Sequence, residues 1–122
     1  MVPLAATRAR TQRLFAPALV LEPGDEAKVM QDEIFGPVLQ IARAETFEEA
    51  LALPSQHAYG NGVALCTRSG RAAREFASRV NVGMVGINVP IPVPVAYHSF
   101  GGWKRSAFGD ANQHGMEGVR FY

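Results

Sequence analysis

Three prolines at alternate positions, Pro90, Pro92 and Pro94, constrain the fold of this 122-residue chain more than any other feature. They follow an apolar run at 83–87, which is typical of a buried strand. Proline has no N–H to donate to a sheet and holds φ at about −65°, so the segment from Asn88 onward cannot be a central strand. We expect an extended segment, similar to polyproline II, whose backbone finds partners outside a sheet.

The proline segment, residues 89–99, leads into a turn in which two glycines lie between two large aromatic residues, Phe100-Gly101-Gly102-Trp103. Glycine permits a left-handed backbone or a close approach of two backbones. A rigid apolar loop at the end of a strand is a natural wall for a binding cleft in an α/β fold, and the neighbouring His98 could line it. The residues themselves leave an alternative open. In it, the segment is a surface crossover loop with a packing role and no ligand, and His98 is an ordinary loop histidine.

Short apolar runs alternate with stretches of helical period along the chain. Thr46 and Glu49 form a capping box for one helix, which Pro54 should end, and Ser69 can cap a second helix at 71–80. A short helix capped by Asp25 is also expected. Strands are expected at 18–21, 38–42, 63–66 and 83–88, with a last strand near 119–122. This order predicts an α/β fold with parallel βαβ units.

Length, composition and charge exclude several classes of protein. The chain is long enough for one domain, which we place at residues 15–122 after a loose N-terminal segment, 1–14. A net charge of +1 indicates neither nucleic acid nor an anionic membrane as a partner, and no apolar run is long enough to span a bilayer. A single cysteine excludes an internal disulfide, and the three histidines lack metal-ligand spacing.

The basic N-terminus bears on the compartment. Arg8, Arg10 and Arg13 precede the first acidic residue, Glu22, and such a start is found in mitochondrial transit peptides. Prolines interrupt any amphipathic helix there, however, and a single cysteine suits a reducing compartment. We therefore expect a cytoplasmic protein, with the mitochondrial matrix as the alternative.

Glu33 and Phe35 are candidate cofactor-binding residues. A carboxylate two residues before an aromatic ring, followed by Gly36-Pro37, is suited to gripping a nucleotide. The carboxylate can accept hydrogen bonds from two ribose hydroxyls, while the ring packs against a flat heterocycle. From the residues alone, a surface glutamate and a core phenylalanine remain the ordinary alternative.

The other reactive or charged side chains are interpreted as structural or solvent-exposed residues. Cys66 lies in an apolar run without a nearby base or cation, so we expect a buried structural cysteine and assign no catalytic residue. Lys104 and Arg105 could meet a phosphate or carboxylate, although a solvated pair is the preferred reading. The arginines of the 71–80 helix are read as its solvated face.

Two stretches carry a resemblance to a known family. NVPIPVPVAYHSFGGWKRSAFGD, which starts at Asn88, and EIFGPV, which starts at Glu33, resemble the methylmalonate-semialdehyde dehydrogenase group of the aldehyde dehydrogenase superfamily. The resemblance runs from about Phe15 to Tyr122 and implies the C-terminal part of the catalytic domain. It also implies that Glu33 binds the nicotinamide ribose, that Phe35 flanks the nicotinamide, and that Phe100 lines the aldehyde tunnel.

The resemblance further implies a reaction and its ligands. Such enzymes oxidise methylmalonate or malonate semialdehyde with NAD and pass the acyl group to coenzyme A, in valine and pyrimidine breakdown. The family's cysteine nucleophile lies in a motif that does not occur here, so the chain is expected to be inactive alone. Its expected partners are further copies or other aldehyde dehydrogenase chains. The alternative is a non-enzymatic module that associates with such subunits or with a separately encoded N-terminal part.

Overall fold

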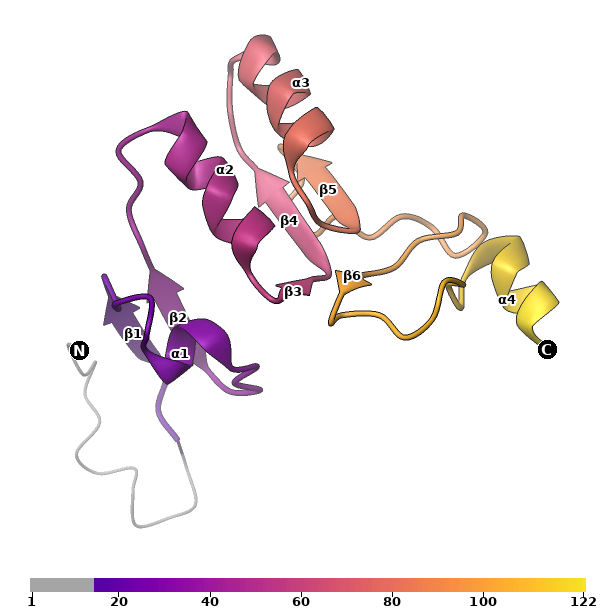
Figure 1. Cartoon of the computed structure of the whole chain (residues 1–122), viewed down its shortest axis with the longest axis horizontal. Coiled ribbons are helices and arrows are strands. Elements are labelled where there is room, and N and C mark those ends of the chain that lie inside the picture. The colour runs from indigo at the N-terminus through magenta and orange to yellow at the C-terminus, as the bar shows by residue number, and fades with distance from the viewer. Residues whose placement is uncertain (1–14) are drawn as a thin grey trace. The chain divides into compact units, whose positions relative to one another are not determined.

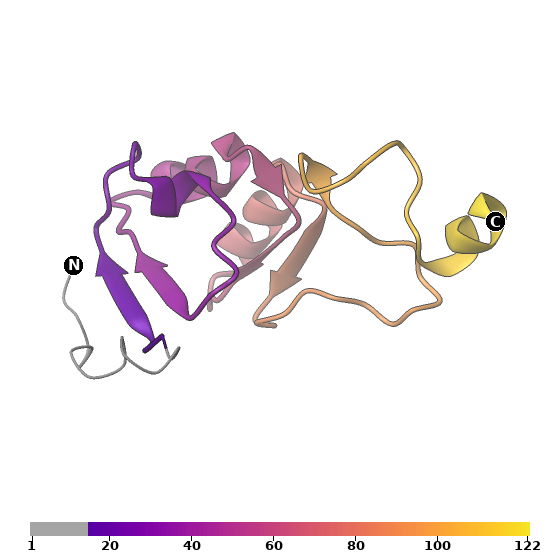
Figure 2. The same cartoon turned by 90° about the horizontal axis from the view of Figure 1, so that it is seen from below.

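The computed structural model describes residues 15–122, which fall into two compact units, 15–45 and 46–122 (Figures 1 and 2). The expected loose segment 1–14 lies outside the described residues. Each unit contains one pair of parallel strands. The pairs are β1 (Ala18–Leu21) with β2 (Val38–Ile41), and β4 (Gly62–Leu65) with β5 (Met84–Ile87). The predicted α/β class with parallel βαβ units is therefore confirmed. Among the described helices, none is long and apolar enough to cross a membrane.

The first unit joins β1 to β2 through one helical turn, α1 (Lys28–Gln31). The side-chain amide of Gln40 on β2 donates to the carbonyl of Val29, at 2.6 Å, and so ties the turn to the strand. The expectation that Asp25 caps this helix was wrong. The N-cap is Ala27, which makes no side-chain cap, and the Asp25 carbonyl instead accepts a hydrogen bond from Gln31.

The second unit contains two longer helices, a second small sheet and a terminal helix. These elements are α2 (Phe47–Gln56), β3 (Tyr59–Gly60), α3 (Gly70–Arg79), β6 (Trp103–Lys104) and α4 (Gly115–Phe121). The antiparallel β3–β6 pair joins residues more than forty positions apart and was not foreseen. The strand expected at the end of the chain was wrong, because residues 115–121 form the helix α4.

Side-chain caps begin both longer helices. The Thr46 hydroxyl accepts from the backbone N–H of Glu49 at 3.2 Å, and the Ser69 hydroxyl accepts from that of Ala72 at 3.2 Å, as predicted. Pro54 does not end α2, which continues to Gln56. Side chains replace the lost backbone bonding there: the Ser55 hydroxyl donates to the Leu51 carbonyl, and the last carbonyls are bound by a lysine described below.

The two faces of the β4–β5 pair carry different side chains. One face presents Val63, Leu65 and Val85 to the helices α2 and α3. Because side chains alternate along a strand, the residues between them point to the other face. The buried residues of the described chain that form the core beneath the helices are Leu51, Phe76, Val80 and Val82.

Small residues on the second face admit the proline segment. A Cβ on Gly86 would lie 2.6 Å from the Val89 carbonyl oxygen and 3.1 Å from Cβ of Pro92. A Cβ on Gly62 would lie 3.1 Å from Cγ of the same proline. Pro92 therefore folds back against the sheet in a place that only glycine leaves open. As predicted, residues 89–99 form neither strand nor helix.

Asn88 turns the chain from β5 into this segment. Its backbone is left-handed, with φ of 58°, and asparagine tolerates that region better than most residues. Its side chain accepts from the Thr67 N–H at 2.8 Å and donates to the Thr67 carbonyl at 3.0 Å. The amide thus continues the β4–β5 ladder with a side chain, while the backbone leaves the sheet.

A salt bridge joins the two long helices. Arg79 of α3 donates two hydrogen bonds to the Glu48 carboxylate of α2, at 2.8 and 2.5 Å, and also contacts Glu75. Arg79 is exposed, as expected for the solvated face of this helix, but its ion pair with Glu48 was not predicted. These hydrogen bonds, together with the charge of Arg79, hold the pKa of the Glu48 carboxyl below its ordinary value of 4.5. They also raise the pKa of Arg79, which stays charged at any acid pH.

Acid should weaken this link. Because the pKa of Glu48 is lowered in the folded protein, its stabilising contribution is complete above pH 4.5 and is lost as the pH falls through the folded value. We expect the urea concentration at the unfolding midpoint of the full chain to decrease as the pH is lowered below 4.5. Glu48→Gln should lower the midpoint at neutral pH and make the acid-side fall shallower. Asp110→Asn, at an exposed carboxylate, serves as the control, and equal profiles for the two variants would contradict the assignment.

Candidate functional site

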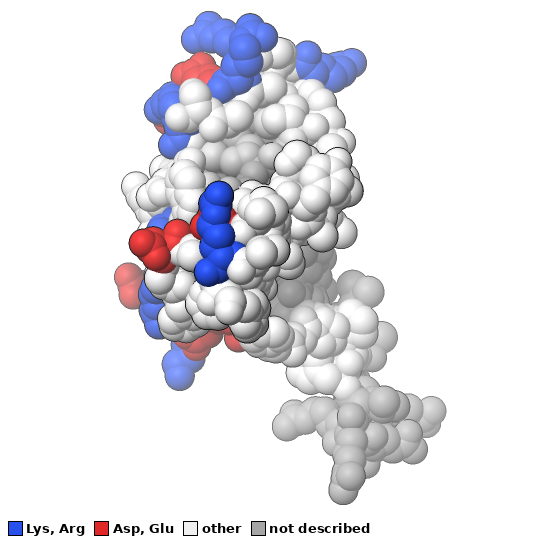
Figure 3. Space-filling model, turned by 90° about the vertical axis from the view of Figure 1, so that its right-hand side faces the viewer, with Lys and Arg blue, Asp and Glu red and all other residues white. Residues whose placement is uncertain are grey.

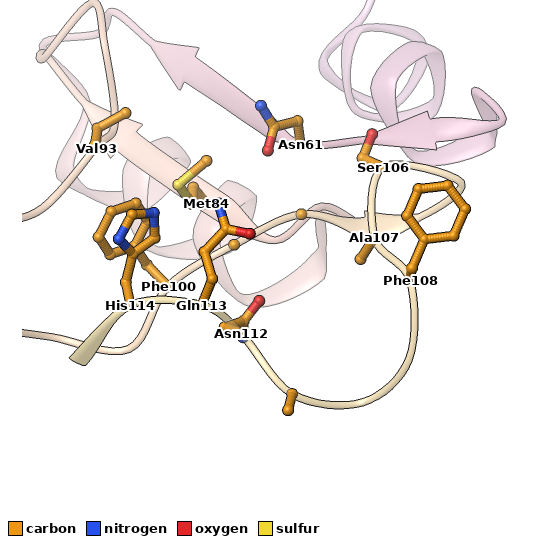
Figure 4. A pocket seen from close by; sticks show the side chains of 13 residues that line it. Asn61, Met84, Val93, Phe100, Ser106, Ala107, Phe108, Asn112, Gln113 and His114 are labelled. Carbon is orange, nitrogen blue, oxygen red and sulfur yellow. The ribbon is translucent and has the colours of Figure 1, made fainter. Parts of the chain in front are cut away.

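A cavity of about 400 Å³ lies beside the Phe100–Trp103 turn, at the N-terminal ends of β4 and β5 (Figure 4). This volume is within the range of small-molecule sites, which begins at about 300 Å³. Its walls come from the turn, from the loop at 106–114 and from the strand ends. The side chains that shape it include Asn61, Met84, Phe100, Ser106, Asn112 and His114.

The rings of Phe100 and His114 stack face to face at one side of the cavity. Their centroids are 4.1 Å apart and their planes differ by 3°. The backbone N–H of Gly115 donates to the Ala96 carbonyl at 3.0 Å, so the start of α4 is fixed to the end of the proline segment. This hydrogen bond joins the segment before the turn, which carries Phe100, to the segment after it, which carries His114, and so holds the two rings together.

Close backbone contacts shape the glycine turn, as the sequence predicted. A Cβ on Gly83 would lie 2.0 Å from the Gly101 carbonyl oxygen and 2.9 Å from Cα of Gly102. A Cβ on Gly101 would lie 2.0 Å from the Asn112 side-chain oxygen. Neither glycine of the turn has a positive φ, so close approach rather than left-handed backbone explains why glycine is needed.

The lining of this cavity is polar but uncharged. Amides, a hydroxyl and an imidazole can donate and accept hydrogen bonds, while Phe100, Met84 and Val93 supply apolar surface. Such a lining suits a small ligand with hydrogen-bonding groups and an apolar part. Among the described residues, no group of three or more His, Cys, Asp and Glu side chains could hold a metal ion.

The two proposed tunnel residues have different positions. Phe100 is half-buried and lines the cavity. His98 is exposed, packs its ring beside Tyr97 with centroids 4.5 Å apart, and is not among the lining residues. The sequence reading missed Asn112 and His114. The sequence around these two residues has no hydrophobic period and no motif, and only the fold brings this loop against the turn.

Glu33 and Phe35 lie in the other unit, on the chain that leads into β2. Both side chains are exposed, and Phe35 has 89% of its surface accessible. Its φ of 42° is unusual for a bulky residue, and such strain is concentrated at functional sites. An apolar hollow of about 440 Å³ lies beside it, with walls from Leu19, Pro37 and Leu39. An exposed carboxylate and an exposed ring with apolar surface nearby fit a nucleotide cofactor.

Cys66 is not the buried residue that we expected. It is exposed and follows the last residue of β4, so the mid-strand reading was wrong. The strand was expected at 63–66, whereas β4 begins one residue earlier, at Gly62, and ends one residue earlier, at Leu65. Four residues of extended chain lie between Asn61 at the cavity and Cys66, and the five steps span about 16.5 Å at about 3.3 Å per residue. The thiol therefore lies at the far end of the strand from the cavity.

Lys104 and Arg105 are not a solvated pair. The Lys104 ammonium is half-buried and donates to three backbone carbonyls at the end of α2, those of Pro54, Ser55 and His57, at 3.0, 3.0 and 2.9 Å. The Arg105 guanidinium lies over the Tyr59 ring, 5.1 Å from its centroid. The sequence contains no local signal for either contact, because the partners are more than forty residues away.

Comparison with known proteins gives one consistent result. The model of the aldehyde dehydrogenase family matches residues 4–122. A malonate-semialdehyde dehydrogenase of Pseudomonas aeruginosa is 59% identical over 97 residues, which are 80% of this chain and 20% of that protein. A malonate-semialdehyde dehydrogenase of Shouchella clausii is 45% identical over the same shares. The chain thus spans about a fifth of the length of these relatives.

Solved structures agree with the sequence comparison. A methylmalonate-semialdehyde dehydrogenase of Sinorhizobium meliloti, complexed with NAD, is 60% identical with a TM-score of 0.82. The alignment covers 85% of this chain and 21% of that one. A methylmalonate-semialdehyde dehydrogenase of Oceanimonas doudoroffii is 56% identical with a TM-score of 0.81, and the alignment again covers 85% of this chain and 21% of that one. The fold and the motif-bearing segments are therefore similar to those of semialdehyde dehydrogenases.

Adding a methyl group at Gly83 should displace the glycine turn. Because a Cβ there meets backbone atoms, Gly83→Ala must move the turn, and overpacking of this kind costs about 1–3 kcal/mol. We expect a lower urea midpoint and a changed emission of Trp103, the single tryptophan of the chain. The control is Gly70→Ala at the start of α3, where the nearest atom is a flexible arginine tip at 3.4 Å. Equal midpoints for the two variants would contradict the close packing.

Proposed function

Because the chain belongs to the aldehyde dehydrogenase family, we propose that it supplies a cofactor-contacting segment and one wall of the aldehyde path to a larger enzyme. That enzyme would be an NAD-dependent, coenzyme A-acylating dehydrogenase of malonate or methylmalonate semialdehyde. The identity of about 60% to two semialdehyde dehydrogenases carries the proposal. More distant members of the family have the same fold at lower identity, such as the betaine aldehyde dehydrogenase of Staphylococcus aureus at 30%.

Glu33 and Phe35 are proposed to hold the nicotinamide end of NAD, which accepts a hydride when it is bound. The exposed Glu33 carboxylate would accept hydrogen bonds from the ribose hydroxyls. The Phe35 ring would pack against the nicotinamide, and its left-handed backbone turns the ring out from the chain toward such a ligand. The presence of NAD in the neighbouring Sinorhizobium structure supports this assignment.

The cavity beside the turn is proposed to border the path of the semialdehyde. Phe100 would line this path, and His98 would stand at its outer rim. No nucleophile is assigned to this chain, because its one cysteine lies far along β4 from the cavity. The acyl group would form on a cysteine outside this segment and pass to coenzyme A. The pathway would be the breakdown of valine and pyrimidines.

Assembly and compartment complete the proposal. The complete enzyme would be a homo-oligomer of such chains or would include other aldehyde dehydrogenase subunits. The proposed compartment is the cytoplasm, and the mitochondrial matrix is the alternative that the three N-terminal arginines suggest.

A second candidate function is a non-enzymatic module that associates with an aldehyde dehydrogenase subunit. The exposed apolar side chains of the second unit favour it. Ile91 and Tyr97 of the proline segment, Phe108 and Phe121 are all at least 70% exposed. Figure 3 shows large uncharged areas on the face that it presents, with the charged side chains gathered into separate groups. Apolar surface of this extent marks sites of association.

The cofactor assignment can be tested in a chimera. This chain would replace the matching fifth of the Pseudomonas aeruginosa relative, and NADH formation would be measured. We expect Glu33→Ala to raise the KM for NAD by about 10- to 100-fold, because two hydrogen bonds to a charged acceptor are lost. Asp32→Ala changes the neighbouring exposed carboxylate and should leave this KM unchanged. If the two variants behave alike, the assignment of Glu33 is wrong.

The module hypothesis predicts association without chemistry. The chain would be mixed with the Pseudomonas aeruginosa relative lacking its matching segment, and co-elution would be measured. Ile91→Asp should weaken the complex at least about tenfold, because it places a charge in a buried apolar contact. Arg68→Asp changes an exposed side chain away from the proline segment and serves as the control. Separate elution of the unaltered chain would rule this function out.

A further inference from the structure

Lys104 makes an unusually complete set of hydrogen bonds for a lysine. Its ammonium has three donors, and each has a carbonyl acceptor at 2.9–3.0 Å in the last turn of α2 or just beyond it. The end of a helix also carries a partial negative charge, which favours a cation. A compact ammonium suits three converging carbonyls better than a planar guanidinium would.

The surroundings of Lys104 are arranged for this contact. Its backbone is left-handed, with φ of 55°, although lysine does not favour that region. A Cβ on Gly60 would lie 2.5 Å from Cε of Lys104, so the glycine provides the space through which the lysine stem passes. Backbone strain and a glycine opposite the stem both indicate that this one side chain is held in one place.

A continuous set of contacts leads from Lys104 to the cavity. Trp103 pairs with Gly60 in the β3–β6 sheet, and the Gly60 N–H donates to the Ser106 hydroxyl at 3.0 Å. Immediately before Trp103, the backbone of Gly101 and Gly102 packs against Gly83. These close contacts leave little freedom, so a shift of the lysine must move the turn. The turn and Ser106 both line the cavity.

We propose that Lys104 is a positioning residue, which anchors the Phe100–Trp103 turn to the end of α2 and so fixes one wall of the cavity. The effect on catalysis rests on the proposed function, in which that wall borders the path of the aldehyde. The effect on the turn itself is independent of any function. Lys104 would touch neither substrate nor cofactor, because its ammonium is occupied by the three carbonyls.

Trp103 provides a direct test in the full chain, since it is the single tryptophan and pairs within the anchored strand. Lys104→Met keeps most of the stem and removes the ammonium. We expect a red shift of the Trp103 emission and a larger acrylamide-quenching constant, because the ring, now 53% exposed, is released. Arg68→Met removes one positive charge from an exposed side chain that is not part of β3 or β6, and it should leave both values unchanged. An unchanged emission and quenching constant in Lys104→Met would overturn the proposal.

A second control separates positioning from simple stabilisation of α2. Ser55→Ala removes the hydroxyl that donates to the Leu51 carbonyl and accepts from the Asn81 N–H, and so weakens the end of α2 and its contact with the following loop while all three carbonyl acceptors of Lys104 remain. We expect little change in Trp103 emission for this variant. The same red shift in Ser55→Ala and Lys104→Met would mean that the signal reports helix stability alone, and the proposal would be wrong.

Chemical rescue keeps the test decisive if Lys104→Met does not fold. Lys104→Cys in a Cys66→Ala background can be alkylated with bromoethylamine, which places an ammonium on a stem of lysine length. Alkylation should restore the Trp103 emission of the unaltered chain. Failure to restore it would overturn the proposal.

The catalytic consequence is measured in the chimera described above. Lys104→Met should lower kcat/KM for the semialdehyde by about 10- to 100-fold, since small misplacement of a positioning group can cost that much, and should leave the KM for NAD unchanged. Equal effects on both substrates would count against a role in the aldehyde path. An inactive unaltered chimera would count against the proposed function, while the Trp103 measurement still decides whether Lys104 anchors the turn.

Discussion

The left-handed turn at Asn88 is the constraint on which the rest of the second unit depends. Its side-chain amide bonds both backbone groups of Thr67, so the sheet is completed without a further residue of strand. The backbone is then free to reverse over the small residues of β4 and β5, where Pro92 lies against Gly62 and Gly86. The proline segment must go there, because it cannot extend the sheet and the helices already cover the opposite face. The cavity lies where this segment ends in the glycine turn.

The distribution of apolar side chains explains why the proposed functions place this chain in a larger assembly. Each unit contains a parallel pair of only two strands, whereas parallel sheets are normally covered on both faces and extended by neighbours. Four hydrophobic residues are buried in the described part, while aromatic and branched side chains remain exposed along the proline segment and α4. Both the dehydrogenase proposal and the module proposal would bury that surface against further protein.

Local physical chemistry was sufficient to predict the parallel strand pairs and the two longer helices, but not β3, β6 or α4. The strand at 18–21, the strand at 38–42 (which ends at Ile41), the caps of α2 and α3 and the parallel pairing followed from hydrophobic period, cap residues and order along the chain. The tail was misread because Val119, Phe121 and Tyr122 have strand-forming side chains, yet the segment folds as α4, which begins at a left-handed Gly115 packed against the backbone of Ser99. The end of α2 was misread because Pro54 falls in its last turns, where Ser55 and Lys104 supply the missing bonds.

The sequence by itself determined the class of fold, the family and the character of the proline segment, because these depend on residues that are near one another in the chain. It also placed Glu33, Phe35 and Phe100 in motifs whose chemistry is local. Only the tertiary structure decided what surrounds Phe100. The stacking of His114, the anchoring of Lys104 on α2 and the exposure of Cys66 all depend on contacts between distant segments, or on which face of a strand a residue occupies. No local pattern encodes such contacts, since they form only when the turn, the helix end and the loop at 106–114 meet.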